Sequence, residues 1–289
     1  GAFCISTSAL TCDITGLTNG TEYTFRAKAT NANGTGSNSS ASGGVTPVTT
    51  PGTATALAGT AGDAQVALSW TAPTDTGGSA ITDYTVESSS DTGTTWTTFA
   101  DGTSTTASAT VTGLTNGTAY TFRVTAVNAQ GSGTATSASS AVTPVTTPGT
   151  PTSLSGTADD ASVVLNWTAP TVTGGTAITD YTVESSSDSG TTWTAFSHDA
   201  ATTASLRVTG LTNGTAYTFR VSAVNAVGTG TASATASATP VTTPTAATSV
   251  AGTAGNAQVA LTWTAPTDNG GTAITDYAVE HSSDSGTTW

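Results

Sequence analysis

One segment recurs three times along the chain, and this recurrence constrains the fold more than any other feature. In its middle copy the segment reads Leu114-Thr-Asn-Gly-Thr-Ala-Tyr120-Thr-Phe-Arg-Val-Thr-Ala-Val-Asn128. The three copies begin at Leu17, Leu114 and Leu211, 97 residues apart. Three tryptophans, Trp70, Trp167 and Trp263, repeat at spacings of 97 and 96 residues. A fixed period marks an array of like modules, and a period of this length matches a complete small domain. The sequence therefore predicts a string of near-identical domains.

Short Pro-Thr segments separate the modules. They occupy residues 45–51, 142–148 and 238–244. Proline fixes φ and disfavours helix at the preceding residue, so we expect short, extended and stiff connections. The predicted segments are residues 1–47, the second half of a module; 48–144 and 145–240, each a complete module; and 241–289, the first half of a module.

Within a module, apolar residues alternate with polar ones. Val66, Leu68 and Trp70 alternate with Ala67 and Ser69, and the same period of two continues through the later segments. Such alternation predicts half-buried antiparallel strands, and Gly-rich turns separate them. About seven short strands in about 97 residues predict an all-β, two-sheet antiparallel sandwich.

The spacing of the apolar residues resembles that of the fibronectin type III domain, an immunoglobulin-like sandwich. The resemblance rests on Leu68-x-Trp70, on Ile81-x-x-Tyr84-x-Val86, and on Leu114-x(5)-Tyr120-x-Phe122-x-Val124-x-Ala126-x-Asn128-x-x-Gly131. It extends over essentially the whole chain and implies tandem seven-stranded sandwiches. It also implies a tyrosine corner, in which a tyrosine hydroxyl bonds to upstream backbone, in each copy: Leu17 with Tyr23, Leu114 with Tyr120, and Leu211 with Tyr217. The Thr- and Gly-rich composition is similar to that of repeats in secreted bacterial proteins.

The two terminal segments are expected to leave core residues such as Trp263, Tyr277 and Val279 uncovered. Two explanations stay open. In one, the sequence is a window on a longer array. In the other, the trailing half of one chain completes the leading half of the next, and this head-to-tail contact builds a filament.

Charge and cysteine content exclude several classes of partner. The formal net charge is −13, with only five Lys and Arg residues. Nucleic acids and anionic membrane surfaces need clustered basic side chains, so neither is expected. No apolar run approaches the roughly 20 residues of a membrane span, so no insertion into a membrane is expected either.

Cys4 and Cys12 are interpreted as a disulfide, which implies an oxidising compartment. A metal-binding pair is the alternative.

The sequence offers no catalytic, cofactor or metal constellation that outweighs a structural interpretation. Asp83 and Glu87 lie four residues apart on one predicted strand face, where a hydrolase could use two carboxylates. We expect them instead to form cross-strand ion pairs with Arg123. A weak Ca²⁺ site at Asp159-Asp160 is an alternative to a solvated turn.

These observations favour a non-enzymatic extracellular or cell-surface array, acting as a stalk, a spacer or the body of a filament. Its expected partners are copies of itself or flanking modules of the same chain. An adhesin, or a carbohydrate-binding accessory segment of a secreted enzyme, is the alternative. That alternative needs exposed aromatic side chains for a partner such as cell-surface polysaccharide, and the candidates are Trp96, Trp193 and Trp289.

Overall fold

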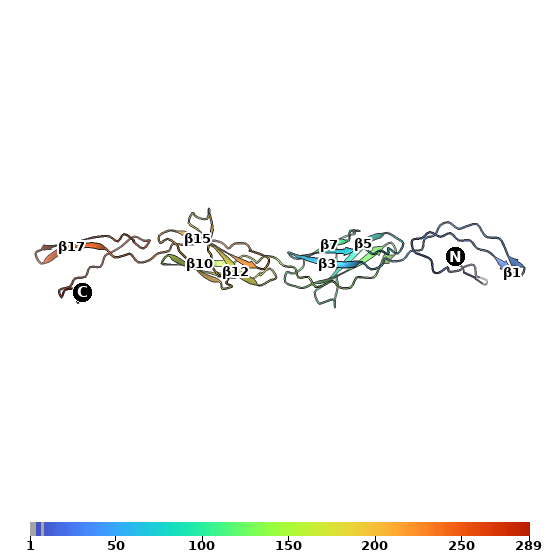
Figure 1. The fold of residues 1–289 in the computed structure, drawn as a ribbon, viewed down its shortest axis with the longest axis horizontal. Coiled ribbons are helices and arrows are strands. Elements are labelled where there is room, and N and C mark those ends of the chain that lie inside the picture. The colour runs from blue at the N-terminus through green and yellow to red at the C-terminus, as the bar shows by residue number, and fades with distance from the viewer. Residues whose placement is uncertain (1–3, 7–8) are drawn as a thin grey trace. The chain divides into compact units, whose positions relative to one another are not determined.

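The computed structural model describes residues 4–6 and 9–289 and divides into two compact units, residues 1–146 and 147–289. Each unit contains one complete β-sandwich and one partial module (Figure 1). No described residue is helical, and all strand pairs are antiparallel, which confirms the predicted fold class. Among the described residues there is accordingly no apolar helix of membrane-spanning length.

The first complete sandwich has seven strands in two sheets. They are β3 (Thr55–Gly62), β4 (Gln65–Thr71), β5 (Ile81–Ser89), β6 (Thr97–Phe99), β7 (Ser108–Thr112), β8 (Thr121–Asn128) and β9 (Gly131–Ser132). One sheet has the order β3-β4-β7 and the other β6-β5-β8-β9.

The second complete sandwich repeats this plan. Its strands are β10 (Thr152–Asp159), β11 (Ser162–Thr168), β12 (Ile178–Ser186), β13 (Thr194–Ala195), β14 (Ser205–Thr209), β15 (Tyr217–Asn225) and β16 (Ala236–Ala238). The sheets have the orders β10-β11-β14 and β13-β12-β15-β16.

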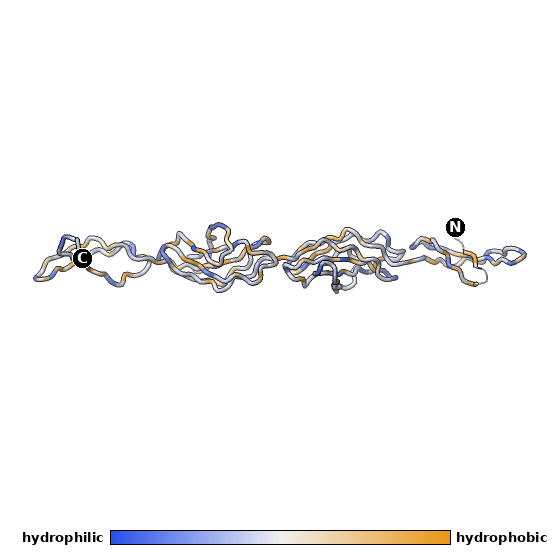
Figure 2. The backbone as a smooth tube through the Cα atoms, turned by 90° about the horizontal axis from the view of Figure 1, so that it is seen from below, coloured by the Kyte–Doolittle hydropathy of each residue, from blue (hydrophilic) through white to orange (hydrophobic). Residues whose placement is uncertain are grey.

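The core of each sandwich lies between its two sheets. Along β4 every second residue is buried, and Trp70 packs edge-on against Tyr84 with 5.2 Å between ring centroids. Phe122 and Val124 of β8 are fully buried in the same cluster. Hydrophobic residues alternate with polar ones along the backbone in Figure 2. Each such side chain contributes roughly 1.5–3 kcal/mol on burial, so the sandwich is stabilised chiefly by this layer.

The change of spacing from 97 to 96 residues is located in the last strand. In the first sandwich, Thr136 and Ser139 accept the N–H groups of Val124 and Phe122 through their side-chain oxygens. Three residues of this segment therefore span two residues of β8. The second sandwich keeps this step, because Ser233 Oγ accepts the N–H of Val221 at 3.1 Å and Ala236 faces Phe219. The missing residue lies beyond this step: residues 139–142 span Tyr120 to Phe122 in the first sandwich, whereas β16 pairs regularly with β15 from Tyr217 to Phe219 in the second.

Each partial module forms one two-stranded pairing among the described residues. Residues 9–47 contain β1 (Thr30–Asn31) and β2 (Gly34–Thr35), and residues 241–289 contain β17 (Thr248–Gly255) and β18 (Gln258–Thr264). Within the described residues no strand forms at Ile14 or after β18. In the complete sandwiches, the strands at these positions pair with neighbours that have no counterpart in the partial modules.

The expected core of the last segment is correspondingly thin. Trp263 still packs near Tyr277, with ring centroids 5.2 Å apart, but it is only half-buried. Tyr277 and Val279 are 36% and 56% exposed. Trp263 therefore differs from Trp70 and Trp167, which are 7% and 8% exposed, because no described strand of this segment corresponds to β7 or β8.

Candidate functional site

The turn before Trp96 is held by the carboxylate of Asp91. This carboxylate accepts hydrogen bonds from Ser89 Oγ at 2.6 Å, Thr95 Oγ1 at 2.7 Å and Thr95 N at 2.9 Å. The bond from Ser89 is the first cause that lowers the pKa of Asp91 to about 2. Thr92 takes a left-handed conformation with φ of 59°. Local bonds alone therefore shape the loop that presents the tryptophan.

Trp96 is covered by a cross-strand arginine. The register of β5 and β8 places Glu87 opposite Arg123. Arg123 donates two bonds to the Glu87 carboxylate, from Nε at 2.7 Å and from an Nη atom at 3.0 Å, and these bonds raise the pKa of Arg123. Its guanidinium carbon lies 4.4 Å from the Trp96 ring centroid, within the range of a cation–π contact.

The second sandwich contains the same cluster. Arg220 lies 4.2 Å over the Trp193 ring and pairs with Glu184 at 2.7 Å. Trp193 also donates from Nε1 to the carbonyl of Gly190 at 3.1 Å. We call these two sets, Trp96-Arg123-Glu87 and Trp193-Arg220-Glu184, the Trp–Arg–Glu clusters.

The last copy of the turn, before Trp289, shows that the aspartate turn does not depend on the cross-strand arginine. Asp284 is bonded by Ser282 Oγ and Thr288 Oγ1 as in the other copies. Trp289, however, is 73% exposed, whereas Trp96 and Trp193 are half-buried. No strand carrying an arginine pairs with this described segment. The aspartate turn therefore forms without an arginine, whereas the tryptophan ring is covered only where an arginine lies over it.

This geometry bears on the three tryptophans as binding side chains. Stacking of a sugar on an indole requires an open ring face. In Trp96 and Trp193 a guanidinium already lies over the ring, and a sugar would have to displace it or use the remaining surface. Trp289 has the most open ring of the three.

One expectation for the carboxylates is wrong. Asp83 does not pair with Arg123; its carboxylate accepts the N–H of Ser104 at 3.0 Å. The cause is distance along a regular ladder: with Glu87 opposite Arg123, Asp83 lies opposite Val127, four residues further along β8. Asp180 likewise accepts from Ala201 at 3.0 Å. The two carboxylates of each pair therefore fasten different parts of the sandwich.

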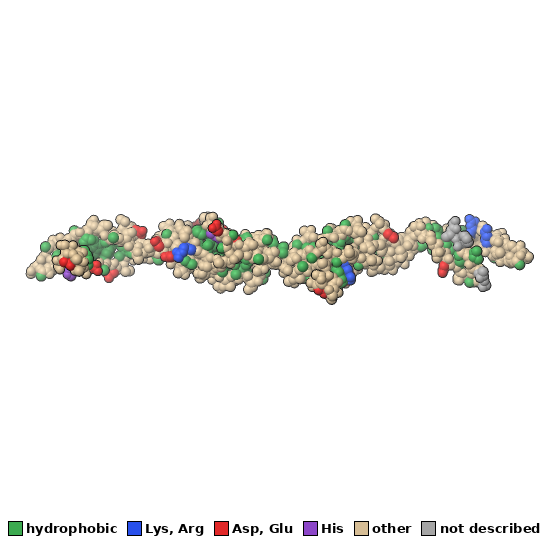
Figure 3. Space-filling model, turned by 60° about the horizontal axis from the view of Figure 1, so that its bottom comes forward, with side chains coloured by type: hydrophobic (Ala, Val, Ile, Leu, Met, Phe, Trp, Pro, Cys, Tyr) green, Lys and Arg blue, Asp and Glu red, His purple; other side chains and the backbone are tan. Residues whose placement is uncertain are grey.

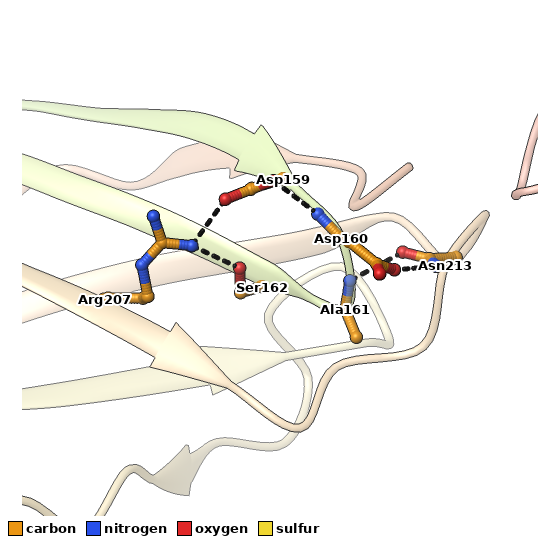
Figure 4. Close-up of polar contacts among 6 residues, drawn as sticks. All are labelled: Asp159, Asp160, Ala161, Ser162, Arg207 and Asn213. Carbon is orange, nitrogen blue, oxygen red and sulfur yellow. Dashed lines mark hydrogen bonds and ion pairs between the residues drawn. The ribbon is translucent and has the colours of Figure 1, made fainter. Parts of the chain in front are cut away.

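The carboxylates of the Asp159-Asp160 turn already accept hydrogen bonds from an arginine and an asparagine, so they do not surround an open cation site. Arg207 Nη1 lies 2.6 Å from Asp159 Oδ2, and it also donates to Ser162 Oγ at 2.8 Å (Figure 4). Asn213 donates to Asp160 at 2.8 Å and accepts from Ala161 N at 2.9 Å. Within residues 4–6 and 9–289, no group of three His, Cys, Asp or Glu side chains is placed to hold a metal ion. The turn is therefore closed by the protein's own donors.

Arg207 was not among the residues singled out in the sequence. Its signal is a difference between the modules: Asp159 and Arg207 replace Gly62 and Thr110 at the equivalent positions. The opposite charges appear together on paired segments. Comparison of the copies with one another could have found the pair.

The tyrosine hydroxyls bond back to the backbone in all three copies. Tyr23, Tyr120 and Tyr217 accept the N–H groups of Thr18, Thr115 and Thr212 at 3.0, 3.2 and 3.2 Å. The leucines of the two complete sandwiches, Leu114 and Leu211, are partly buried against the cores, and Leu17 is half-buried. Cys4 and Cys12 form a disulfide with Cα atoms 6.2 Å apart.

Comparison with known families and structures gives one family. The model of the fibronectin type III domain matches residues 51–143 and 149–239. Among solved structures, the chain is similar to the FN1–FN3 domains of chicken CNTN1, with 22% sequence identity and a TM-score of 0.39; the match covers 74% of this chain and 75% of that one.

Proposed function

This chain belongs to the fibronectin type III family, and we propose that it serves as an extracellular structural array that sets a distance, as a stalk, a spacer or the body of a surface filament. The observation that carries the proposal is how the repeated polar contacts are used. In both complete sandwiches the Trp–Arg–Glu cluster, the aspartate turn and the tyrosine hydroxyl connect parts of the same sandwich. What the copies share is therefore the means of holding each module together.

The connections between modules support the same role. The N–H of Gly52 donates to Asp75 O, and the side chain of Asn128 donates to Thr49 O, both at 2.8 Å. The first Pro-Thr connection and the residue after it are thus bonded into the sandwich that follows. A connection with few unbonded residues keeps a defined length, which suits a spacer.

The surface is consistent with a solvated spacer. On the face shown in Figure 3, most of the area is backbone and uncharged polar side chains, and charged groups are few and scattered. The net charge of −13 favours solubility and repulsion between neighbouring chains. The disulfide between Cys4 and Cys12 supports an oxidising, extracellular location. The similarity of the Thr- and Gly-rich composition to that of secreted bacterial repeats is the basis for proposing a bacterial surface protein.

The test is a change of module number in the protein displayed on a cell. Deletion of residues 145–240 removes one module and one connection. A spacer predicts that an epitope beyond the array moves closer to the membrane, as measured by energy transfer to a membrane dye, and that reinsertion of a copy of residues 48–144 restores the distance. An unchanged distance would contradict the spacer role.

Binding to polysaccharide is the alternative that the same protein can test. Pull-down of the full chain on insoluble polysaccharides, with Trp96→Ala and Trp193→Ala as variants, distinguishes the two. Retention that depends on these tryptophans would favour a carbohydrate-binding module, whereas absence of retention favours the spacer.

A further inference from the structure

Two glycine backbones meet where residues 1–47 join the first complete sandwich. Gly20 follows Asn19 in the turn after the leucine of the repeated segment, and Gly78 lies in the loop between β4 and β5. A Cβ atom built on Gly78 would lie 2.8 Å from Gly20 Cα and 2.9 Å from the carbonyl carbon of Asn19. Real Cβ atoms do not approach backbone this closely. The absence of a side chain at Gly78 is therefore a condition of the contact.

The same contact occurs independently in the other unit. A Cβ atom on Gly271 would lie 2.9 Å from both Gly214 Cα and the carbonyl carbon of Asn213. Gly271 and Gly214 are the counterparts of Gly78 and Gly20 in the repeat. Since two separate joints have the same backbone contact at equivalent residues, the contact belongs to the repeat and not to one location.

The connecting chain is bonded on both sides of each contact. Gly20 N donates to Pro47 O at 3.0 Å, and Thr49 N donates to Gly77 O at 2.8 Å. Only Val48 lies between these two anchors. In the other unit, Gly214 N donates to Pro240 O at 2.9 Å, and Thr242 N donates to Gly270 O at 2.8 Å. At each joint, the last bond to the preceding module and the first bond to the following module are thus made by connection residues only two positions apart.

We propose that the Asn-Gly turn of each of these modules is a docking surface whose partner is the Gly-Gly loop of the next module of the same chain. The two backbone bonds of the connection hold the turn and the loop in contact, and the missing Cβ atoms let them approach. This inference rests on the proposed spacer function and deepens it, because it identifies the contact that resists bending at a joint.

The left-handed conformation of Gly78 does not by itself explain the contact, and the chain provides a matched control. Gly113 has φ of +75°, close to the +78° of Gly78, but a Cβ built there has no atom within 4 Å. Gly113→Ala and Gly78→Ala therefore impose similar backbone strain on the same sandwich. Only the second substitution places a methyl group in the joint.

The experiment measures amide hydrogen exchange by NMR in the full chain. In Gly78→Ala, the amides of Thr49 and Gly20, which donate the two bonds of the connection, are expected to exchange about tenfold faster than in Gly113→Ala. The core amide of Val86 should behave alike in both variants. Equal exchange of Thr49 and Gly20 in the two variants would overturn the proposal.

A second variant covers the case in which Gly78→Ala unfolds the sandwich. Gly20→Ala changes the opposite side of the contact, outside that sandwich, and its Cβ would lie 3.1 Å from Gly78 Cα. We expect faster exchange of Thr49 than in Gly113→Ala, with Val86 unaffected; no difference would overturn the docking surface. Flexible joints would still allow a spacer, and the module-deletion experiment tests the spacer separately, so the two failures are distinguishable.

Discussion

The hydroxyl of Thr136 is predicted to stabilise the first complete sandwich through one buried hydrogen bond. The Thr136 backbone N–H donates to Val124 O at 2.9 Å, and Val124 N donates to Thr136 Oγ1 at 3.1 Å. Both residues are buried. The substitution Thr136→Val keeps the shape of the side chain and removes only the acceptor of the Val124 N–H.

The magnitude follows from what the substitution leaves behind. No cavity forms, because valine and threonine have similar volume, so the loss is the hydrogen bond together with the cost of a buried N–H without a partner. That cost is about 1–3 kcal/mol. Since about 1.4 kcal/mol corresponds to a factor of ten in an equilibrium constant, exchange through opening of this sandwich should accelerate between about fivefold and about 150-fold.

The assay is native-state hydrogen exchange of the full chain, read at core amides of both sandwiches. The amides of Val86 and Phe122 report the first sandwich, and that of Val183 in the second serves as an internal reference. Thr134→Val, at an exposed position of the same segment, is the matched control. The reasoning is refuted if Thr136→Val and Thr134→Val change the opening free energy of the first sandwich equally.

Three further predictions concern the turns of the same sandwich. Ala64→Gly relieves a left-handed alanine with φ of 50°, and denaturant unfolding of the full chain should show stabilisation of up to about 1 kcal/mol, less than the relief of strain because glycine orders at greater entropic cost. Tyr120→Phe removes the acceptor of the Thr115 N–H and should lower stability by about 0.5–1.5 kcal/mol in the same assay; an unchanged midpoint would contradict a role in locking the sheets. The pKa of Asp91 is lowered from 3.8 to about 2, first by the Ser89 bond, so its contribution is complete above about pH 4 and disappears as the pH falls to about 2, and acid unfolding of Asp91→Asn should show a smaller loss over that interval.

The architecture of the complete modules was predictable because its signals are short-range and repeated. Alternation along β4 and β8 identifies the buried faces from the side chains alone, and the Gly-rich turns separate the strands. The tyrosine bond was predictable for the same reason: Tyr120 and Thr115 are five residues apart. Contacts of this kind depend little on how distant segments are paired.

Contacts that depend on register could not be predicted in detail. Asp83 and Glu87 lie on the same strand face, but the register places Glu87 opposite Arg123 and Asp83 opposite Val127, four residues away along β8. The stacking of Arg123 on Trp96 also depends on the strand order, because Trp96 immediately precedes β6, Arg123 lies on β8, and β5 lies between these strands. The apolar–polar pattern is local, whereas a strand forms only where a partner supplies the other half of its hydrogen bonds, and at Ile14 no strand forms.

The differences between the two complete modules argue that their constraint is internal. Where Gly62 and Thr110 of one sandwich become Asp159 and Arg207 in the other, the new charges pair with each other at 2.6 Å. Where the last strand loses a residue, Ala236 joins a regular ladder and needs no hydroxyl. In both cases a change is matched by a contact within the same sandwich, while the exposed surface of the module is altered. A surface that recognises one ligand in every copy would have to keep its exposed side chains together, whereas a spacer needs only to keep each sandwich and its connections intact.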